Sequence, residues 1–92
     1  MKAVHSATIL AVDDTEARLY FLSRVLTKAG FEVLQATNGM QGLALAAQQE
    51  PDLILLDIRL PDIDGLTVLE KLRQGYSDAA VIVMKPPVYL VI

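Results

Sequence analysis

Three aspartates stand directly after apolar runs that predict buried strands. Asp13 and Asp14 follow the run 8–12, and Asp57 follows the run 53–56. In an open α/β sheet, ligands bind outside the carboxyl ends of the strands, where the strand order reverses. If these two strands are neighbours, their ends lie about 4.8 Å apart. The three carboxylates would then meet in one pocket.

The chemistry of such a pocket follows from its charge. Repulsion among three carboxylates raises the pKa of at least one of them unless a cation lies between them. Oxygen ligands without His or Cys favour a hard ion such as Mg²⁺. A carboxylate beside bound Mg²⁺ can attack a phosphoryl group, because the metal neutralises the charge on the phosphoryl oxygens. A single aspartate after a strand is more often a cap or turn residue, so the grouping of three carries the prediction.

The elements that position these aspartates alternate between two hydrophobic periods. The segments 8–12, 31–36, 53–56 and 79–84 predict strands, and 15–29, 42–49 and 66–75 predict amphipathic helices. In the first helix, five apolar residues fall on one face: Leu19, Leu22, Val25, Leu26 and Ala29. Repeated strand–helix units with unbroken apolar strands indicate an α/β fold with a parallel sheet and right-handed crossovers.

The composition limits the size and class of the protein. Its 92 residues suffice for one domain, and 53% hydrophobic residues can fill a core, which excludes intrinsic disorder. A net charge of −3 gives no basic surface for nucleic acid or an anionic membrane, and zero cysteines fit a reducing compartment. No apolar run reaches the roughly 18 residues of a membrane span. We expect a cytoplasmic domain that binds neither nucleic acid nor membrane.

The strings around the aspartates resemble the receiver domain of two-component response regulators. They are Ile-Leu-Ala-Val-Asp13-Asp14-Thr-Glu and Pro51-Asp-Leu-Ile-Leu-Leu-Asp57-Ile-Arg-Leu-Pro61-Asp-Ile-Asp-Gly65, and the resemblance covers residues 8–84. It implies a flavodoxin-like (CheY-like) α/β fold, a doubly wound parallel sheet of order 2-1-3-4-5. We expect residues 1–92 to be a single receiver-like domain with its core at 8–84 and an atypical tail at 85–92.

The resemblance also implies roles for individual residues. Asp57 would be the phosphoacceptor of a phosphorelay, and the partner would be a histidine kinase or a phosphotransfer protein. Asp13, Asp14, Asp57 and the backbone carbonyl of Arg59 would bind Mg²⁺, with Asp14 the more direct ligand. Pro61 and Gly65 would shape the loop after Asp57, where glycine allows close backbone approach and positive φ. The chain would then be a signal-transduction phosphoprotein and no enzyme beyond its own phosphorylation and dephosphorylation.

The C-terminal part departs from the receiver pattern. The family has a Ser or Thr directly after strand four and a Lys-Pro pair after strand five. Lys85 holds the Ser/Thr position when strand four is aligned, whereas Lys85-Pro86 fits the Lys-Pro pair when the dipeptide is aligned. Both alignments cannot hold, and no Ser or Thr follows Ser77. The C-terminal part is therefore incomplete, and the contact of Lys85 with a phosphoryl group has an uncertain register.

The apolar segment Val88–Ile92 predicts a fifth strand. A parallel neighbour of strand four needs a crossover of about a dozen residues, but only Lys85, Pro86 and Pro87 separate the two. The segment can turn back, run on as an extension, pair with another molecule, or be foreign to the domain. An uncharged apolar edge strand seeks a partner, which favours a homodimer through this strand.

Two other functions compete with the phosphoacceptor. The missing hydroxyl favours a phosphorylation-independent pseudo-receiver that only binds partners. A Mg²⁺-dependent aspartyl phosphohydrolase of the haloacid-dehalogenase-like family requires the motif Asp-x-Asp at the end of its first strand. The sequence Asp13-Asp14-Thr15 lacks this motif. The arginines are interpreted as solvated helix or loop residues: Arg18, Arg24, Arg59 and Arg73.

Overall fold

Strands and helices alternate along the chain, as the apolar runs predict. The structure is a computed structural model that describes residues 6–85 and 88–91. Its elements are β1 (Thr8–Val12), α1 (Glu16–Lys28), β2 (Glu32–Ala36), α2 (Gly39–Gln49), β3 (Leu53–Asp57), α3 (Gly65–Lys71), a π-helical turn (Leu72–Tyr76), β4 (Ala80–Lys85) and β5 (Val88–Val91). Asn38 caps α2 by accepting a hydrogen bond from the Gln41 N–H.

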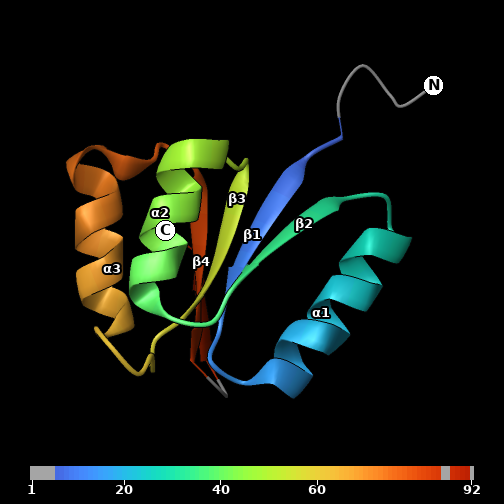
Figure 1. Ribbon diagram of the computed structural model, residues 1–92, viewed down its shortest axis with the longest axis horizontal. Coiled ribbons are helices and arrows are strands. Elements are labelled where there is room, and N and C mark those ends of the chain that lie inside the picture. Colours follow the sequence, from blue (N-terminus) through green and yellow to red (C-terminus); the bar gives the residue numbers. More distant parts are fainter. Residues whose placement is uncertain (1–5, 86–87, 92) are drawn as a thin grey trace.

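The sheet has the order β2-β1-β3-β4-β5. Figure 1 shows the first four of these strands, with β1 parallel to both β2 and β3. Val12, the last residue of β1, lies opposite Ala36 of β2 and Leu56 of β3. β4 continues the parallel sheet beside β3. The flavodoxin-like order of the first four strands is thereby confirmed, and so is the neighbourhood of β1 and β3 on which the aspartate pocket depends.

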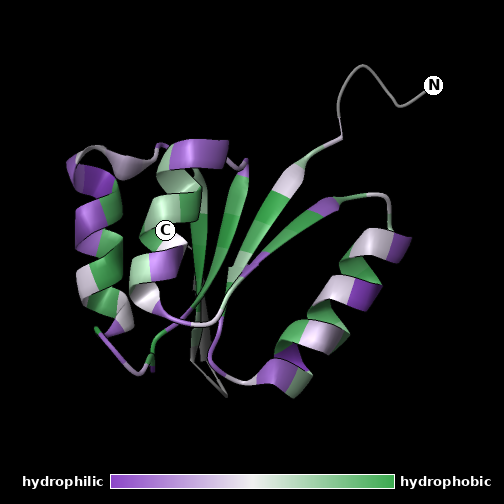
Figure 2. Ribbon diagram, viewed as in Figure 1, coloured by the Kyte–Doolittle hydropathy of each residue, from purple (hydrophilic) through white to green (hydrophobic). Residues whose placement is uncertain are grey.

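Alternate strand residues build the core between the sheet and the helices α2 and α3. The cluster combines strand residues with helix residues: Leu10, Val12, Ile54, Leu56, Val81 and Val83 with Leu43, Ala46, Val68 and Leu72. Figure 2 shows the strands as the hydrophobic centre and the helices as hydrophilic on their outer sides. Burying one such large side chain contributes roughly 1.5–3 kcal/mol. This layer holds the strand ends in place.

The other sheet face is covered more sparsely. α1 packs on β1 and β2, but of its predicted apolar face only Leu19 is buried, while Val25 is 49% exposed. The five residues predicted to share one face therefore differ in burial, with Leu22 and Leu26 half-buried. In the described part of the chain, no second helix covers this face of β3 and β4, so Ile82 and Met84 stay half-buried.

β5 turns back and pairs antiparallel with β4, with Val88 opposite Lys85 and Val91 opposite Ile82. Of the predicted placements, the structure adopts the return within the chain. The parallel fifth strand of a complete receiver is not among residues 6–85 and 88–91, which confirms the incomplete C-terminal part. Pro86 and Pro87 lie outside the described residues.

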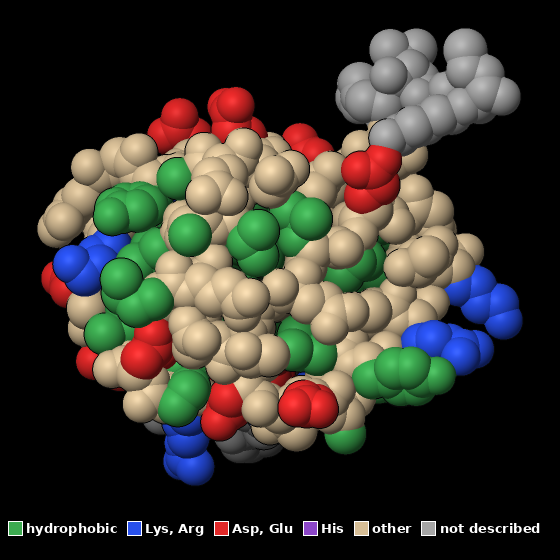
Figure 3. Space-filling model, viewed as in Figure 1, with side chains coloured by type: hydrophobic (Ala, Val, Ile, Leu, Met, Phe, Trp, Pro, Cys, Tyr) green, Lys and Arg blue, Asp and Glu red, His purple; other side chains and the backbone are tan. Residues whose placement is uncertain are grey.

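The face that carries α2 and α3 presents both acidic and basic side chains, with apolar ones scattered between them (Figure 3). Exposed large apolar side chains include Met40, Leu66 and Tyr76. Among the described residues, no helix has both the length and the apolar character to cross a membrane.

Candidate functional site

The three aspartates lie together at the carboxyl ends of β1 and β3. One carboxylate oxygen from each of Asp13, Asp14 and Asp57 lies within 4.8 Å of the others. Asp13 is fully buried, Asp57 is 6% exposed and Asp14 is exposed. The structure confirms the prediction that these three carboxylates lie close together. Their donor set, carboxylate oxygens only, fits a hard divalent cation such as Mg²⁺.

Arg18, in the first turn of α1, also belongs to this site. Its Nε donates to Asp13 Oδ2 at 2.5 Å, and its Nη2 donates to Asp13 Oδ1 at 3.2 Å and to Asp57 Oδ2 at 3.3 Å. The interpretation of Arg18 as a solvated helix residue is incomplete, because its exposed side chain also binds Asp13 and Asp57. A basic residue four positions after Asp14, on the first helical turn, is the signal that could have found it.

The pKa values of the two buried carboxyls, Asp57 and Asp13, are shifted in opposite directions. Burial raises the pKa of Asp57, and the negative charge of Asp13 adds to this effect. Hydrogen bonding from the Arg59 N–H and the positive charge of Arg18 oppose the rise without cancelling it. Burial also disfavours ionised Asp13, but hydrogen bonds from Arg18 and the Thr15 N–H outweigh it and lower the pKa of Asp13. Asp13 is thus the ionised anchor of the cluster.

The loop after β3 is tied closely to Asp57. The Arg59 N–H donates to Asp57 Oδ1 at 3.1 Å, and the Gly65 N–H donates to the Ile58 carbonyl at 2.8 Å. A Cβ on Gly65 would lie 2.5 Å from Ile58 Cα and 2.6 Å from the Asp57 carbonyl oxygen. The close approach of the backbone at Ile58 and Asp57 explains why residue 65 is glycine. The expected positive φ of Gly65 is wrong, because its φ is not positive.

Asp62 fastens the same loop to α2. Its two carboxylate oxygens accept hydrogen bonds from the Gly39 and Met40 N–H groups, both at 2.8 Å. Desolvation raises the pKa of Asp62. These two hydrogen bonds and the other backbone hydrogen bonds to its carboxylate outweigh that effect and lower the pKa. A carboxylate at a helix N-terminus is stabilised in this way by unpaired backbone donors. Sequence analysis missed this anchor of the loop.

The remaining predicted residues lie at the edges of the site. Arg59 is exposed and contributes a backbone N–H to Asp57. Lys85 ends β4 one residue after Met84, which lies opposite Asp57. The side chain of Lys85 lies outside what the structure describes, so its contact with a phosphoryl group stays a prediction.

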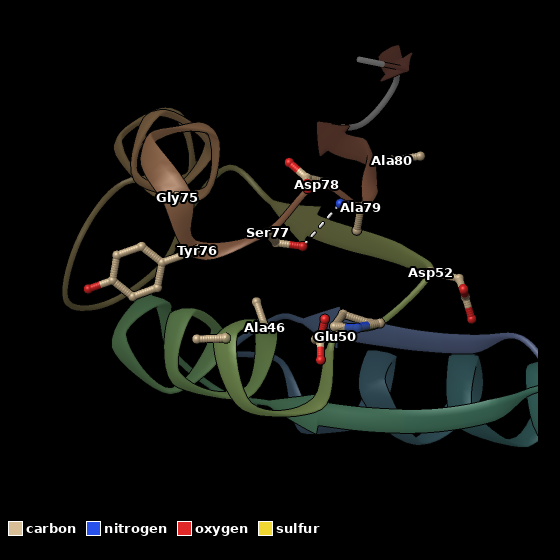
Figure 4. A pocket seen from close by; sticks show the side chains of 11 residues that line it. Ala46, Glu50, Asp52, Gly75, Tyr76, Ser77, Asp78, Ala79 and Ala80 are labelled. Atoms are coloured by element: carbon tan, nitrogen blue, oxygen red, sulfur yellow. Dashed lines mark hydrogen bonds between the residues drawn. The ribbon is translucent and has the colours of Figure 1, made fainter.

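A hollow of about 510 Å³ lies at the opposite end of the sheet. Figure 4 shows its lining by Glu50, Asp52 and Tyr76, and the hydrogen bond from the Ala79 N–H to Ser77 Oγ. Its residues precede β3 and β4, so it opens at the amino ends of these strands. It takes no part in the aspartate cluster.

Residues 9–85 match the family described as the response regulator receiver domain. The chain belongs to this family. Receiver domains are the phosphoacceptors of two-component signal transduction, and the order of β1 to β4 with aspartates at the ends of β1 and β3 agrees with that membership.

Two curated relatives and one solved structure illustrate the similarity. The chain is 45% identical over 76 residues to the DNA-binding dual master transcriptional regulator RpaA of Synechocystis sp., covering 83% of this chain and 32% of that protein. It is 37% identical over 76 residues to sporulation initiation phosphotransferase F of Bacillus subtilis, covering 83% and 61%. A CheY-like receiver domain protein of Methanospirillum hungatei superposes with a TM-score of 0.78 at 36% identity, covering 86% and 63%. The chain thus spans less than two thirds of the length of these relatives.

Proposed function

We propose that this domain accepts a phosphoryl group on Asp57 from a histidine kinase or a phosphotransfer protein, with Mg²⁺ held by the aspartate cluster. The observation that carries the proposal is the nearly buried Asp57 carboxyl, within 4.8 Å of two further carboxylates. Arg18 is the cation that contacts Asp13 and Asp57, and Mg²⁺ would supply further positive charge to the three carboxylates. Residues 1–92 would act as one receiver-like domain, with its core at 8–84.

In the proposed reaction, an Asp57 carboxylate oxygen attacks the phosphorus of a phosphohistidine. The new P–O bond forms as the P–N bond breaks, and the histidine, whose other ring nitrogen is protonated in the phosphohistidine, leaves as neutral imidazole. Asp13, Asp14, Asp57 and the Arg59 carbonyl would hold Mg²⁺, which when bound neutralises charge on the phosphoryl oxygens. Lys85 would add a positive charge, since it directly follows the residue opposite Asp57. The domain would turn over no separate substrate.

The pseudo-receiver is the second candidate function. It is favoured by the lack of any Ser or Thr after Ser77, because a phosphoryl group on Asp57 would then have no Ser or Thr hydroxyl to bind at the end of β4. In that case the domain would bind partners through its fold alone, and Asp57 would stay unmodified.

Incubation with Mg²⁺ and acetyl phosphate, followed by intact-mass measurement, tests the phosphoacceptor. We expect one phosphoryl adduct, absent in Asp57→Asn because the amide is no nucleophile, and reduced in Asp14→Ala because the metal loses a ligand. Asp78→Asn, an exposed aspartate remote in sequence from the cluster, is the matched control and should keep the adduct. Absence of any adduct in the unmodified chain would favour the pseudo-receiver, and sustained release of phosphate would favour the phosphohydrolase.

We propose a cytoplasmic location and no nucleic-acid or membrane partner for this domain. The net charge of −3 and the mixed charges on the visible face support this, since nucleic acid and anionic lipid attract basic surfaces.

We further propose that the chain forms a homodimer through β5, which stands at the edge of the sheet. An edge strand offers unpaired backbone groups to a second copy. Light scattering should give a mass above 10.0 kDa for the 92-residue chain and the monomer mass after deletion of 88–92. Deletion of 1–5 is the control for shortening the chain. A monomeric full chain, or a dimer that survives loss of 88–92, would contradict this interface.

A further inference from the structure

One nitrogen of Arg18 stands between two carboxylates of the aspartate cluster. Nη2 lies 3.2 Å from Asp13 Oδ1 and 3.3 Å from Asp57 Oδ2, while Nε holds the other oxygen of Asp13. Arg18 thus contacts both oxygens of Asp13 and one of the two oxygens of Asp57, the carboxylates that a shared cation would also bind. Arg18 in this position therefore competes with a divalent ion for these carboxylates.

We propose that Arg18 is a tethered competitor of the metal: its guanidinium occupies the Asp13–Asp57 pair when the metal is absent and must leave when Mg²⁺ binds. The inference rests on the proposed function, because it takes the cluster as the Mg²⁺ site. Arg18 would then help to set the Mg²⁺ affinity of the aspartate cluster, and so the Mg²⁺ concentration at which Asp57 becomes reactive.

The surroundings of Arg18 allow this exchange. Its side chain is 44% exposed, whereas the side chain of Asp13 is completely buried. The guanidinium can therefore return to water without burying an unpaired charge, while Asp13 requires a cation at all times. The remaining contact of Nη2, with Thr15 Oγ1 at 3.2 Å, is also exposed. Arg18 is thus the mobile partner and Asp13 the fixed one.

The expected size of the effect follows from competition. The apparent dissociation constant of a ligand rises by the inverse of the fraction of protein that is competent to bind. If Arg18 holds the pair about nine-tenths of the time, its removal tightens Mg²⁺ binding about tenfold, and two-thirds occupancy gives about threefold. We expect a gain within this range.

Calorimetric titration with Mg²⁺ of the unmodified chain, Arg18→Gln and Arg24→Gln tests the proposal. Arg24 lies on the same helix, is exposed and donates to the Tyr20 hydroxyl at 2.9 Å, so its variant removes the same charge without touching the cluster. Arg18→Gln should bind Mg²⁺ at least about threefold more tightly, whereas Arg24→Gln should match the unmodified chain. Equal or weaker binding by Arg18→Gln would overturn the proposal.

A second measurement uses the unmodified chain alone. The arginine Nε–H signal of Arg18 in an ¹H–¹⁵N spectrum should be protected by its bond to Asp13 and should shift to the solvent-exposed position as Mg²⁺ saturates the site. An unmoved signal at saturation would contradict displacement. If Mg²⁺ binds to neither the unmodified chain nor Arg18→Gln, the metal site itself fails; if both bind it equally, only the competition fails.

Discussion

Replacing Gly65 by alanine should lower the melting temperature by at least about 10 °C, since about 1 kcal/mol corresponds to roughly 4–8 °C in a domain of this size. The added Cβ would meet Ile58 Cα at 2.5 Å and the Asp57 carbonyl oxygen at 2.6 Å. Both are backbone atoms that cannot rotate away, so the loop must move. Overpacking costs typically 1–3 kcal/mol, and a clash with backbone belongs at the upper end. Thermal unfolding followed by circular dichroism measures the loss.

Gly42→Ala is the matched control for this substitution. The atoms nearest to its Cβ would belong to the side chain of Val12, the first at 2.9 Å, and none of them is backbone. Alanine also favours the helix interior by about 1 kcal/mol over glycine. We expect a clearly smaller loss than for Gly65→Ala. Equal melting temperatures of Gly65→Ala and the unmodified chain would show that the loop yields easily and that close approach is not the reason for glycine.

Replacing Asp57 by asparagine should stabilise the metal-free protein at neutral pH by a few degrees. The pKa of Asp57 is raised in the folded state, first by burial and then by the charge of Asp13. The folded state therefore holds the Asp57 proton more strongly than the unfolded chain does. The resulting contribution to the free energy of unfolding is complete below the pKa of Asp57 in the unfolded chain. It is lost as the pH rises through the pKa of Asp57 in the folded state. Asparagine keeps the neutral form at every pH.

The pH dependence of unfolding should separate Asp57 from Asp13. The pKa of Asp13 is lowered, because hydrogen bonds from Arg18 and Thr15 outweigh its burial. Its ionised form contributes stability above the unfolded pKa, which is lost as the pH falls through the folded value. In EDTA, Asp57→Asn should gain stability and Asp13→Asn should lose it at pH 7, and the two should converge in acid. A loss of stability in Asp57→Asn at pH 7 would contradict the sign of its shift.

The strand ends and their aspartates are features that sequence reasoning can reach. Unbroken apolar runs mark parallel strands buried on both faces, and Asp13, Asp14 and Asp57 each stand where such a run stops. The strand order came from the resemblance to receiver domains, and the pairing of β1 with β3 agrees with it. The inability of Val88–Ile92 to lie parallel beside β4 followed from the length of the connection alone.

The amphipathic face of α1 shows where a periodic pattern says too little. The pattern at Leu19, Leu22 and Val25 identifies a helix, but burial depends on how much sheet lies beneath it and on which neighbouring helices are present. α1 covers β1 and β2, so Leu19 is buried and Val25 is not. A helical pattern reports the direction of a side chain and not the extent of the surface that receives it.

The sequence by itself determined the α/β alternation, the three carboxylates at strand ends and the short connection before β5, because these depend on residues near one another along the chain. Only the tertiary structure decided that Arg18, which is local to Asp13 in the sequence, also meets Asp57. Arg18 reaches Asp57 across 39 residues of sequence, since β3 packs beside β1 and brings Asp57 next to the start of α1. Local periodicity carries no information on such a contact, because it is created by the order of the strands.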